Sequence, residues 1–81
     1  MTIRSADPTT LDLKGLNCPL PALRTLKALK ALAPGETLIV ECTDPLSAID
    51  VPHCAFEHGH LLEAQSNEGG VLRFRIRRSA Q

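Results

Sequence analysis

The chain has 81 residues, 43% of them apolar, which fits one domain with its own core and excludes a globally disordered chain. Nine Lys and Arg balance nine Asp and Glu, and two Phe are the only aromatic residues, which argues against direct nucleic-acid binding. No apolar run reaches the roughly 20 residues of a membrane span and no secretory signal is evident, so we expect a cytoplasmic protein.

The first predicted element is a short strand near the N-terminus. Residues 1–8 are polar, and we expect them to be flexible. Thr10–Lys14 alternates polar and apolar side chains, which predicts a strand, and Gly15 ends it.

The second predicted element is a helix that begins at Pro19 and ends before Pro34. At about 100° per residue, apolar residues at helical spacing form its buried face, namely Ala22, Leu26, Leu29 and Ala33. Arg24 and Lys27 lie on the opposite side with Leu20 among them, so we expect Leu20 to be exposed.

A strand and a second helix follow. Thr37–Cys42 is rich in apolar and β-branched residues, which predicts a strand. Asp44 then resembles a helix N-cap, with Pro45 at the first position of a helix that ends near His58. Pro52 lacks the N–H that a continuous helix needs, so we expect a kink there or a break into two helical pieces.

The chain closes with a predicted hairpin. Strands over Leu61–Ser66 and Val71–Arg77 are joined by the turn signal Asn67–Gly70. The order β-α-β-α-β-β predicts an α/β (α+β) two-layer sandwich, with two helices on one face of a four-stranded mixed sheet. The other face carries charges of both signs, from Asp12, Glu41, Glu63, Arg73, Arg75 and Arg77. We expect a solvated charge ladder there, or alternatively a docking surface for an acidic partner or RNA.

The segment Cys18-Pro19-Leu20-Pro21 connects the first strand to the first helix. If the helix begins at Pro19, Cys18 is its N-cap, and the helix dipole is expected to lower the pKa of the thiol. The prolines fix the backbone where no intrahelical hydrogen bond is lost, and the Leu20 N–H is free to bond the sulfur. Nearby cations would add positive potential, namely Lys14, Arg24 and Lys27.

No general base accompanies Cys18, because all three His lie beyond residue 50. A Cys-His hydrolase is therefore a poor fit, whereas sulfur exchange needs only a thiolate, a leaving group and access. The alternative is that Cys18 merely starts the helix, although Ser, Thr, Asp and Asn are the preferred N-caps.

Gly15–Pro21, followed by a Leu-rich basic helix, resembles the signature of TusA/SirA-type sulfur carriers. The similarity spans about residues 9–78 and includes Pro34–Leu38, Asp44-Pro45, Asp50–Pro52, Cys54 and the hairpin. It implies the same sandwich fold as a single domain over 9–78, with 79–81 as a tail. It also implies that Cys18, supported by Gly15, Pro19 and Pro21, carries sulfane sulfur as a persulfide.

The resemblance further implies two partners, a cysteine desulfurase or rhodanese-like donor and a downstream acceptor protein. The family's routes include tRNA 2-thiouridine synthesis, molybdenum-cofactor maturation, sulfur oxidation and thiosulfate handling. Leu20 and Ile49 stand where tRNA-thiolating members tend to have Glu and Arg, which counts against that route. We expect a carrier without turnover of its own and without a cofactor, which binds partners through Leu20, Arg24, Lys27 and Asp44.

The remaining thiols and imidazoles leave one alternative open. Cys42 is expected to be a buried small residue, or a resolving thiol that forms a disulfide with Cys18 in a thiol-redox or regulatory partner-binding module. Cys54 matches a core position of the family. The spacing of His53, Cys54, His58 and His60 does not suit a structural zinc site, so we expect no metal.

Overall fold

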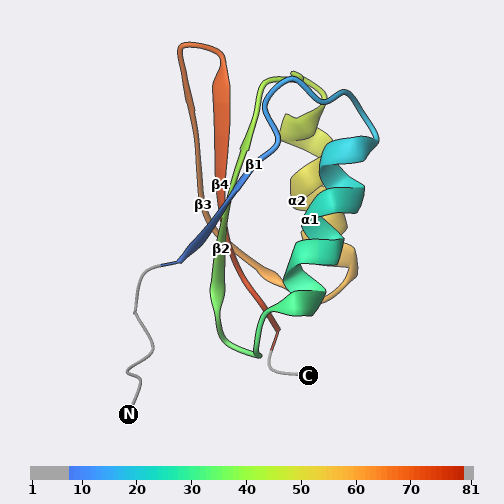
Figure 1. The fold of residues 1–81 in the computed structure, drawn as a ribbon, viewed down its shortest axis with the longest axis vertical. Helices are drawn as coiled ribbons and strands as arrows, with labels where there is room; N and C mark the ends of the chain where they lie inside the picture. The colour runs from blue at the N-terminus through green and yellow to red at the C-terminus, as the bar shows by residue number, and fades with distance from the viewer. Residues whose placement is uncertain (1–7, 80–81) are drawn as a thin grey trace.

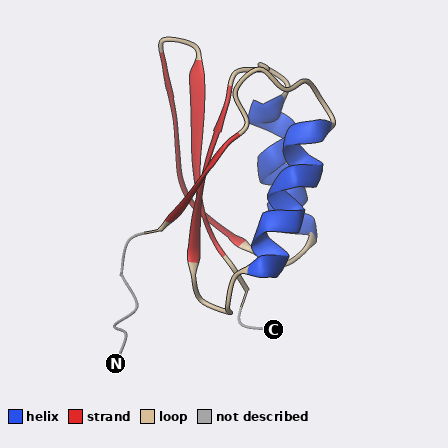
Figure 2. Cartoon of the chain, in the orientation of Figure 1, coloured by secondary structure: helices blue, strands red, loops and turns tan. Residues whose placement is uncertain are grey.

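The computed structural model describes residues 8–79, so the predicted flexible segment 1–8, apart from Pro8, and the last two residues of the tail lie outside it. The elements are β1 (Thr9–Asp12), α1 (Leu20–Ala31), β2 (Thr37–Cys42), α2 (Ser47–Glu57), β3 (Leu61–Glu68) and β4 (Val71–Arg77). Both helices cover one face of the four-stranded sheet and leave the other face open (Figure 1, Figure 2). The predicted two-layer sandwich is confirmed.

The strand order β1-β2-β4-β3 combines one parallel pair with two antiparallel ones. β1 and β2 are parallel, so their carboxyl ends lie side by side at one end of the sheet. The connections to α1 and α2 both start there. The β3–β4 hairpin turns through Gly69 and Gly70, whose φ angles of 58° and 86° require the left-handed region that glycine adopts without strain. β3 runs two residues further than predicted, to Glu68.

The core lies between the sheet and the helices. β2 and β4 direct alternate residues inward, and α1 and α2 cover them, so that the following apolar side chains are buried: Leu29, Leu38, Val40, Val51, Ala55, Leu72, Phe74 and Ile76. This alternation explains why the bounds of β2 and β4 match the prediction from sequence.

The predicted buried face of α1 is only partly right. Leu29 is buried, but it is joined by Pro21 and Thr25, and Ala33 is exposed. The helix ends at Ala31 and Leu32 already has extended backbone, so Ala33 is not on the helix at all. Burial of the Thr25 hydroxyl is tolerated because it donates to the Pro21 carbonyl at 2.7 Å.

α2 is one continuous helix with Pro52 inside it, so the alternative of two helical pieces is wrong. It also begins later than predicted, at Ser47, because Pro45 and Leu46 form a turn before it. At its other end the His58 ring lies 3.0 Å from the Cys54 carbonyl and complements the helix C-terminus.

The open face of the sheet carries the predicted charge ladder. Glu63 pairs with Arg75 at 3.2 Å and Arg77 at 2.7 Å, and this pairing, with Arg77 first, lowers the pKa of Glu63. Asp12 pairs with Lys14 at 3.2 Å, not with an arginine as expected. The arginines of the ladder are exposed to solvent, whereas Glu41 and Glu63 are half-buried.

Candidate functional site

Cys18 is exposed in the turn between β1 and α1. The helix begins at Leu20 with Pro19 as its N-cap, so the prediction that Cys18 is the N-cap is wrong by one residue. The peptide bond between Cys18 and Pro19 is cis. The Leu20 N–H donates to the Asn17 carbonyl at 2.9 Å, so it is not directed at the sulfur as expected.

Two carboxylates hold Cys18, one from the connection between β2 and α2 and one from α2 itself. Asp44, which precedes α2, accepts the Cys18 backbone N–H through Oδ2 at 2.6 Å. Asp50, in the first turn of α2, accepts a hydrogen bond from the Cys18 thiol, with 2.5 Å between Sγ and Oδ2. The site is therefore built where the parallel strands β1 and β2 end side by side.

These carboxylates reverse the predicted electrostatics of the thiol. The hydrogen bond to Asp50 raises the pKa of Cys18, and partial desolvation and the negative charges of Asp50 and Asp44 act in the same direction. The expected lowering by the helix dipole is wrong, because the sulfur lies outside the helix end and next to a full negative charge. Lys14 does not offset this charge, since its ammonium group binds Asp12 and Glu41.

The predicted supporting residues shape the loop in different ways. Gly15 has φ of 88°, which favours glycine, and donates its N–H to the Thr43 hydroxyl at 2.9 Å. Pro21 is buried and anchors the start of α1, whereas Pro19 is exposed beside the thiol. The two loops are thus cross-linked by hydrogen bonds at Gly15 and at Cys18 itself.

Exposed apolar side chains flank these contacts. Leu20 is 42% exposed, as predicted, and Leu46 and Ile49 are 55% and 68% exposed. Leu46 follows Asp44 by two residues and Ile49 precedes Asp50, so all three side chains belong to the segments that hold Cys18. We call Leu20, Leu46 and Ile49 the apolar rim.

The other residues predicted to bind partners fall into two groups, a groove on α1 and the loop that holds Cys18. Arg24 and Lys27 line a groove between α1 and the edge strand β1, whose apolar part is formed by Leu11, Ala28 and Ala31. Asp44 is used within the loop, where it binds backbone N–H groups of Cys18 and Leu46.

The remaining thiols are held within the protein. Cys42 is fully buried, which raises its pKa, and Cys54 is half-buried with its sulfur 3.9 Å from the Ala22 carbonyl oxygen. In the described range, residues 8–79, no three His, Cys, Asp or Glu side chains are grouped to hold a metal ion. No helix in that range has the length and apolar character needed to cross a membrane.

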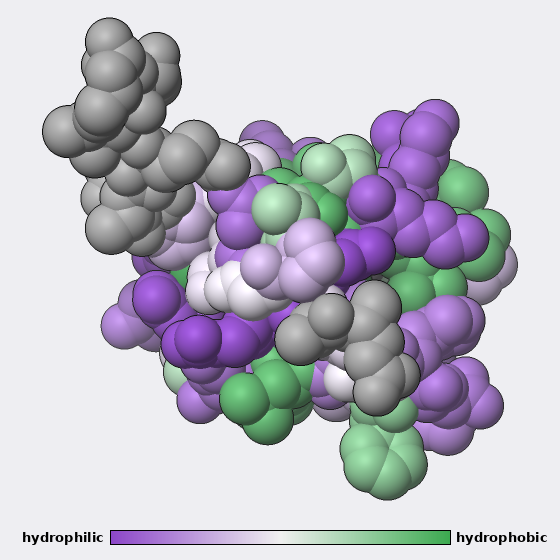
Figure 3. All heavy atoms as spheres, turned by 90° about the horizontal axis from the view of Figure 1, so that it is seen from below, coloured by the Kyte–Doolittle hydropathy of each residue, from purple (hydrophilic) through white to green (hydrophobic). Residues whose placement is uncertain are grey.

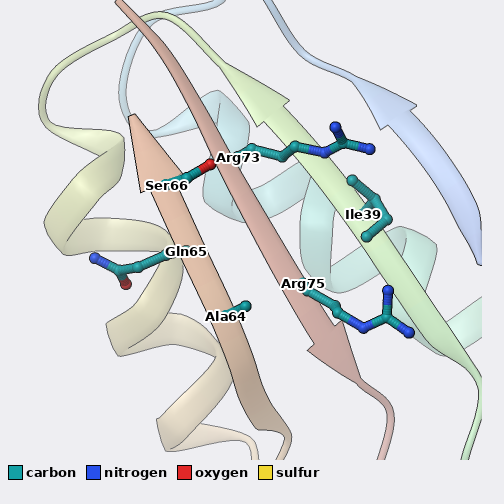
Figure 4. Close-up of a pocket in the computed structure, with 6 residues that line it drawn as sticks. All are labelled: Ile39, Ala64, Gln65, Ser66, Arg73 and Arg75. Carbon is teal, nitrogen blue, oxygen red and sulfur yellow. The ribbon is translucent and has the colours of Figure 1, made fainter. Parts of the chain in front are cut away.

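A separate cavity lies on the open face of the sheet. Ile39 and Ala64 form its apolar part, and the Arg73 and Arg75 side chains extend along it (Figure 4). It contains no thiol or imidazole, and its arginines pair with Glu41 and Glu63. The end of the molecule seen from below in Figure 3 is mainly hydrophilic, with apolar residues in separate patches. Neither surface competes with Cys18 as a reactive site.

Asp50 is the site residue that the sequence interpretation missed. The sequence indicates Asp50 only as part of the family resemblance, because it lies 32 residues from Cys18 in the chain. The predicted topology nevertheless indicates this contact. The carboxyl ends of the parallel strands β1 and β2 lie side by side, which brings the first turn of α2 beside the loop that holds Cys18.

Comparisons with known proteins agree on one family. Residues 9–78 match the family described as sulfurtransferase TusA. The chain is 45% identical over 69 residues to the sulfur carrier protein TusA of Allochromatium vinosum, covering 85% of this chain and 91% of the relative. It is 41% identical over 68 residues to the putative sulfur carrier protein YrkI of Bacillus subtilis, covering 84% and 91%. The crystal structure of a SirA-like protein from Desulfitobacterium hafniense superposes with a TM-score of 0.78 at 27% identity, covering 88% of this chain and 97% of that one.

Proposed function

This chain belongs to the sulfurtransferase TusA family, and on that basis we propose that it is a sulfur carrier that holds sulfane sulfur as a persulfide on Cys18. The observation that carries this assignment is the exposed Cys18 thiol in a loop cross-linked by Asp44, with the exposed apolar rim on the same segments. The functional unit is the single domain over residues 9–78, acting in the cytoplasm.

The transfer chemistry requires no cofactor. The Cys18 sulfur attacks the outer sulfur of a donor persulfide, a new S–S bond forms at Cys18, and the donor's S–S bond breaks. The electron pair of the broken bond stays on the donor's cysteine, which takes up the proton that Cys18 loses. A thiol of the acceptor protein then attacks the sulfane sulfur on Cys18 in the same way.

Two kinds of partner are required. The donor is a cysteine desulfurase or a rhodanese-like protein, and the acceptor is a downstream protein of sulfur trafficking. The apolar rim is the docking surface for both, because exposed apolar side chains around a reactive atom bury area when a partner covers it. The groove lined by Arg24 and Lys27 extends the contact to an acidic partner surface.

A thiol-redox function with Cys42 is not favoured. Cys42 is fully buried in the core, and Cys18 hydrogen-bonds to Asp50. An oxidant would therefore reach Cys42 only after the core opens locally.

Intact-mass spectrometry after incubation with a cysteine desulfurase and cysteine tests the assignment. The wild-type protein is expected to gain about 32 Da per sulfur atom, and reductant is expected to remove the added mass. Cys54→Ser is the matched control and should load like the wild type, because Cys54 packs against α1. If Cys18→Ser gains as much sulfur as the wild type, the assignment to Cys18 is wrong.

A further inference from the structure

We propose that Asp50 keeps Cys18 protonated at rest, and that a donor protein must neutralise or displace this carboxylate before Cys18 accepts sulfur. This inference rests on the proposed sulfur-carrier function and describes how sulfur loading of Cys18 is regulated. Asp50 touches the reacting sulfur directly, with 2.5 Å between Oδ2 and Sγ.

The direction of the contact follows from the chemistry of the two groups. An ionised carboxylate can only accept a hydrogen bond, so the proton of this short contact belongs to the sulfur. A thiolate in the same position would face the Asp50 charge at contact distance, with Asp44 close by. The arrangement therefore stabilises the thiol relative to the thiolate.

The charges around Cys18 come from three segments. Asp50 is contributed by α2 and Asp44 by the connection before it, and both act against the thiolate. Lys14, in the loop between β1 and α1, is bound to Asp12 and Glu41 on the open face of the sheet. Arg24, on α1, lies in the groove beside β1. Within residues 8–79, the charged groups that shift the pKa of Cys18 are thus the two carboxylates, Asp50 and Asp44.

A resting thiol of this kind is protected until a partner arrives. Thiolate is the nucleophile in sulfur exchange, so a protonated Cys18 reacts slowly with small persulfides, disulfides and alkylating agents. A cationic group that pairs with Asp50 would remove both the hydrogen bond and the negative charge.

The structure therefore specifies the chemistry of the donor. Its docking surface carries a Lys or Arg next to the persulfide, placed to reach the Asp50 carboxylate. The transfer remains balanced as described above, with the Cys18 proton ending on the donor's cysteine. The sulfane sulfur is neither oxidised nor reduced in the exchange.

The direct test measures alkylation of Cys18 by iodoacetamide as a function of pH. Trypsin separates the thiols cleanly, because Cys18 is the single cysteine of residues 15–24, whereas Cys42 and Cys54 both fall in residues 31–73. Asp50→Asn is expected to lower the alkylation midpoint by about one pH unit. The rate at pH 7 should then rise about threefold, because about tenfold more thiolate is offset by its lower nucleophilicity. Glu57→Gln removes a charge from the same helix, two turns further along, and should leave the Cys18 profile unchanged.

A measurement on the wild type makes the test independent of any variant's folding. The Cys18 midpoint of the folded protein is expected to lie above that of the same protein unfolded in urea. Equal midpoints, or an Asp50→Asn profile identical to the wild type, would overturn the proposal.

Persulfide loading separates this proposal from the proposed function. Asp50→Asn should accept sulfur faster than the wild type from a small donor, glutathione persulfide. With a protein donor, the difference in loading rate between the two proteins should be smaller. If the midpoint does not move but the wild type loads sulfur, the carrier function stands and the role of Asp50 falls. If the midpoint moves but neither protein loads sulfur on Cys18, the role of Asp50 stands and the carrier function falls.

Discussion

The carboxylate of Asp44 accepts the backbone N–H of Cys18 across two separate connections of the fold, with 2.6 Å between the two atoms. Its second oxygen accepts the Leu46 N–H at 3.1 Å, so one side chain fixes the loop after β1 and the turn before α2. The backbone of the reactive residue is thus held by Asp44, while its sulfur is held by Asp50. Asp44 thus positions the backbone of Cys18, whereas both carboxylates disfavour the thiolate, Asp50 mainly through its hydrogen bond and Asp44 through its charge.

Asp44→Ala is expected to loosen both loops without unfolding the sheet. Loss of a hydrogen bond to a partly exposed side chain costs about 1 kcal/mol, so amide hydrogen exchange at Cys18 and Leu46 should accelerate roughly fivefold. Exchange at Val40, in the centre of β2, should not change. Unchanged protection of the Cys18 amide would show that Asp44 does not hold this loop.

The apolar rim makes a prediction about transfer between proteins. Ile49→Ser removes an exposed apolar side chain next to Asp50 without adding charge. We expect kcat/KM for sulfur transfer from a protein donor to fall about tenfold, mainly through KM, because the lost contact contributes about 1–2 kcal/mol to docking.

Leu61→Ser is the matched control for the rim. Leu61 is similarly exposed, at 57%, but begins β3 at the opposite end of the sheet. Equal losses of transfer in both variants would mean that the rim is not the docking surface. Alkylation of Cys18 should be the same in both variants, because both keep the Asp44 and Asp50 carboxylates and neither substitution adds a charge.

The architecture was predictable because it follows from local patterns. Alternation in Val71–Arg77, the glycine turn and the crossover from β1 to β2 determine the layers and the strand order. The charge partners of Arg75 and Arg77 followed from the same alternation. Cys18 was identifiable because its neighbours match a family motif.

The protonation of Cys18 was not predictable in the same way. The sequence predicts a lowered pKa from the adjacent helix, whose dipole acts within its first turn, and from the nearby cations Lys14, Arg24 and Lys27. The decisive group, Asp50, comes from another helix and contacts the sulfur through tertiary structure. A one-residue error in the start of α1 also mattered, because it separated Cys18 from the helix end. The sign of a pKa shift depends on such contacts, which local patterns do not specify.

The buried face of α1 can be tested by a pair of leucines. Leu29 is fully buried against the sheet, whereas Leu23 on the same helix is 57% exposed. Leu29→Ala should lower the free energy of unfolding by about 2–5 kcal/mol, and Leu23→Ala by less than about 0.5 kcal/mol. Urea denaturation measures both. Similar losses would contradict the assignment of Leu29, rather than Leu23, to the core.

His60 links stability to pH at the opposite end of the molecule from Cys18. Its Nδ1 accepts the Ser79 backbone N–H at 2.9 Å, which requires an unprotonated nitrogen. Partial burial lowers the pKa of His60, and the positive charges of Arg78 and His58 act in the same direction. The unfolded chain therefore takes up this proton first as the pH falls. The stabilisation is complete above the unfolded pKa of about 6.5 and is lost as the pH falls below it.

Thermal unfolding at pH 7.5 and pH 5 tests this linkage. His60→Asn retains an acceptor near the position of Nδ1 but cannot be protonated in this range. The wild type is expected to lose about 2–4 °C more in Tm than His60→Asn between the two pH values. Carboxylates titrate in both proteins alike, so the difference between them reports His60. The same loss in both proteins would assign the acid sensitivity to other groups, because only the wild type has a proton to gain at this position.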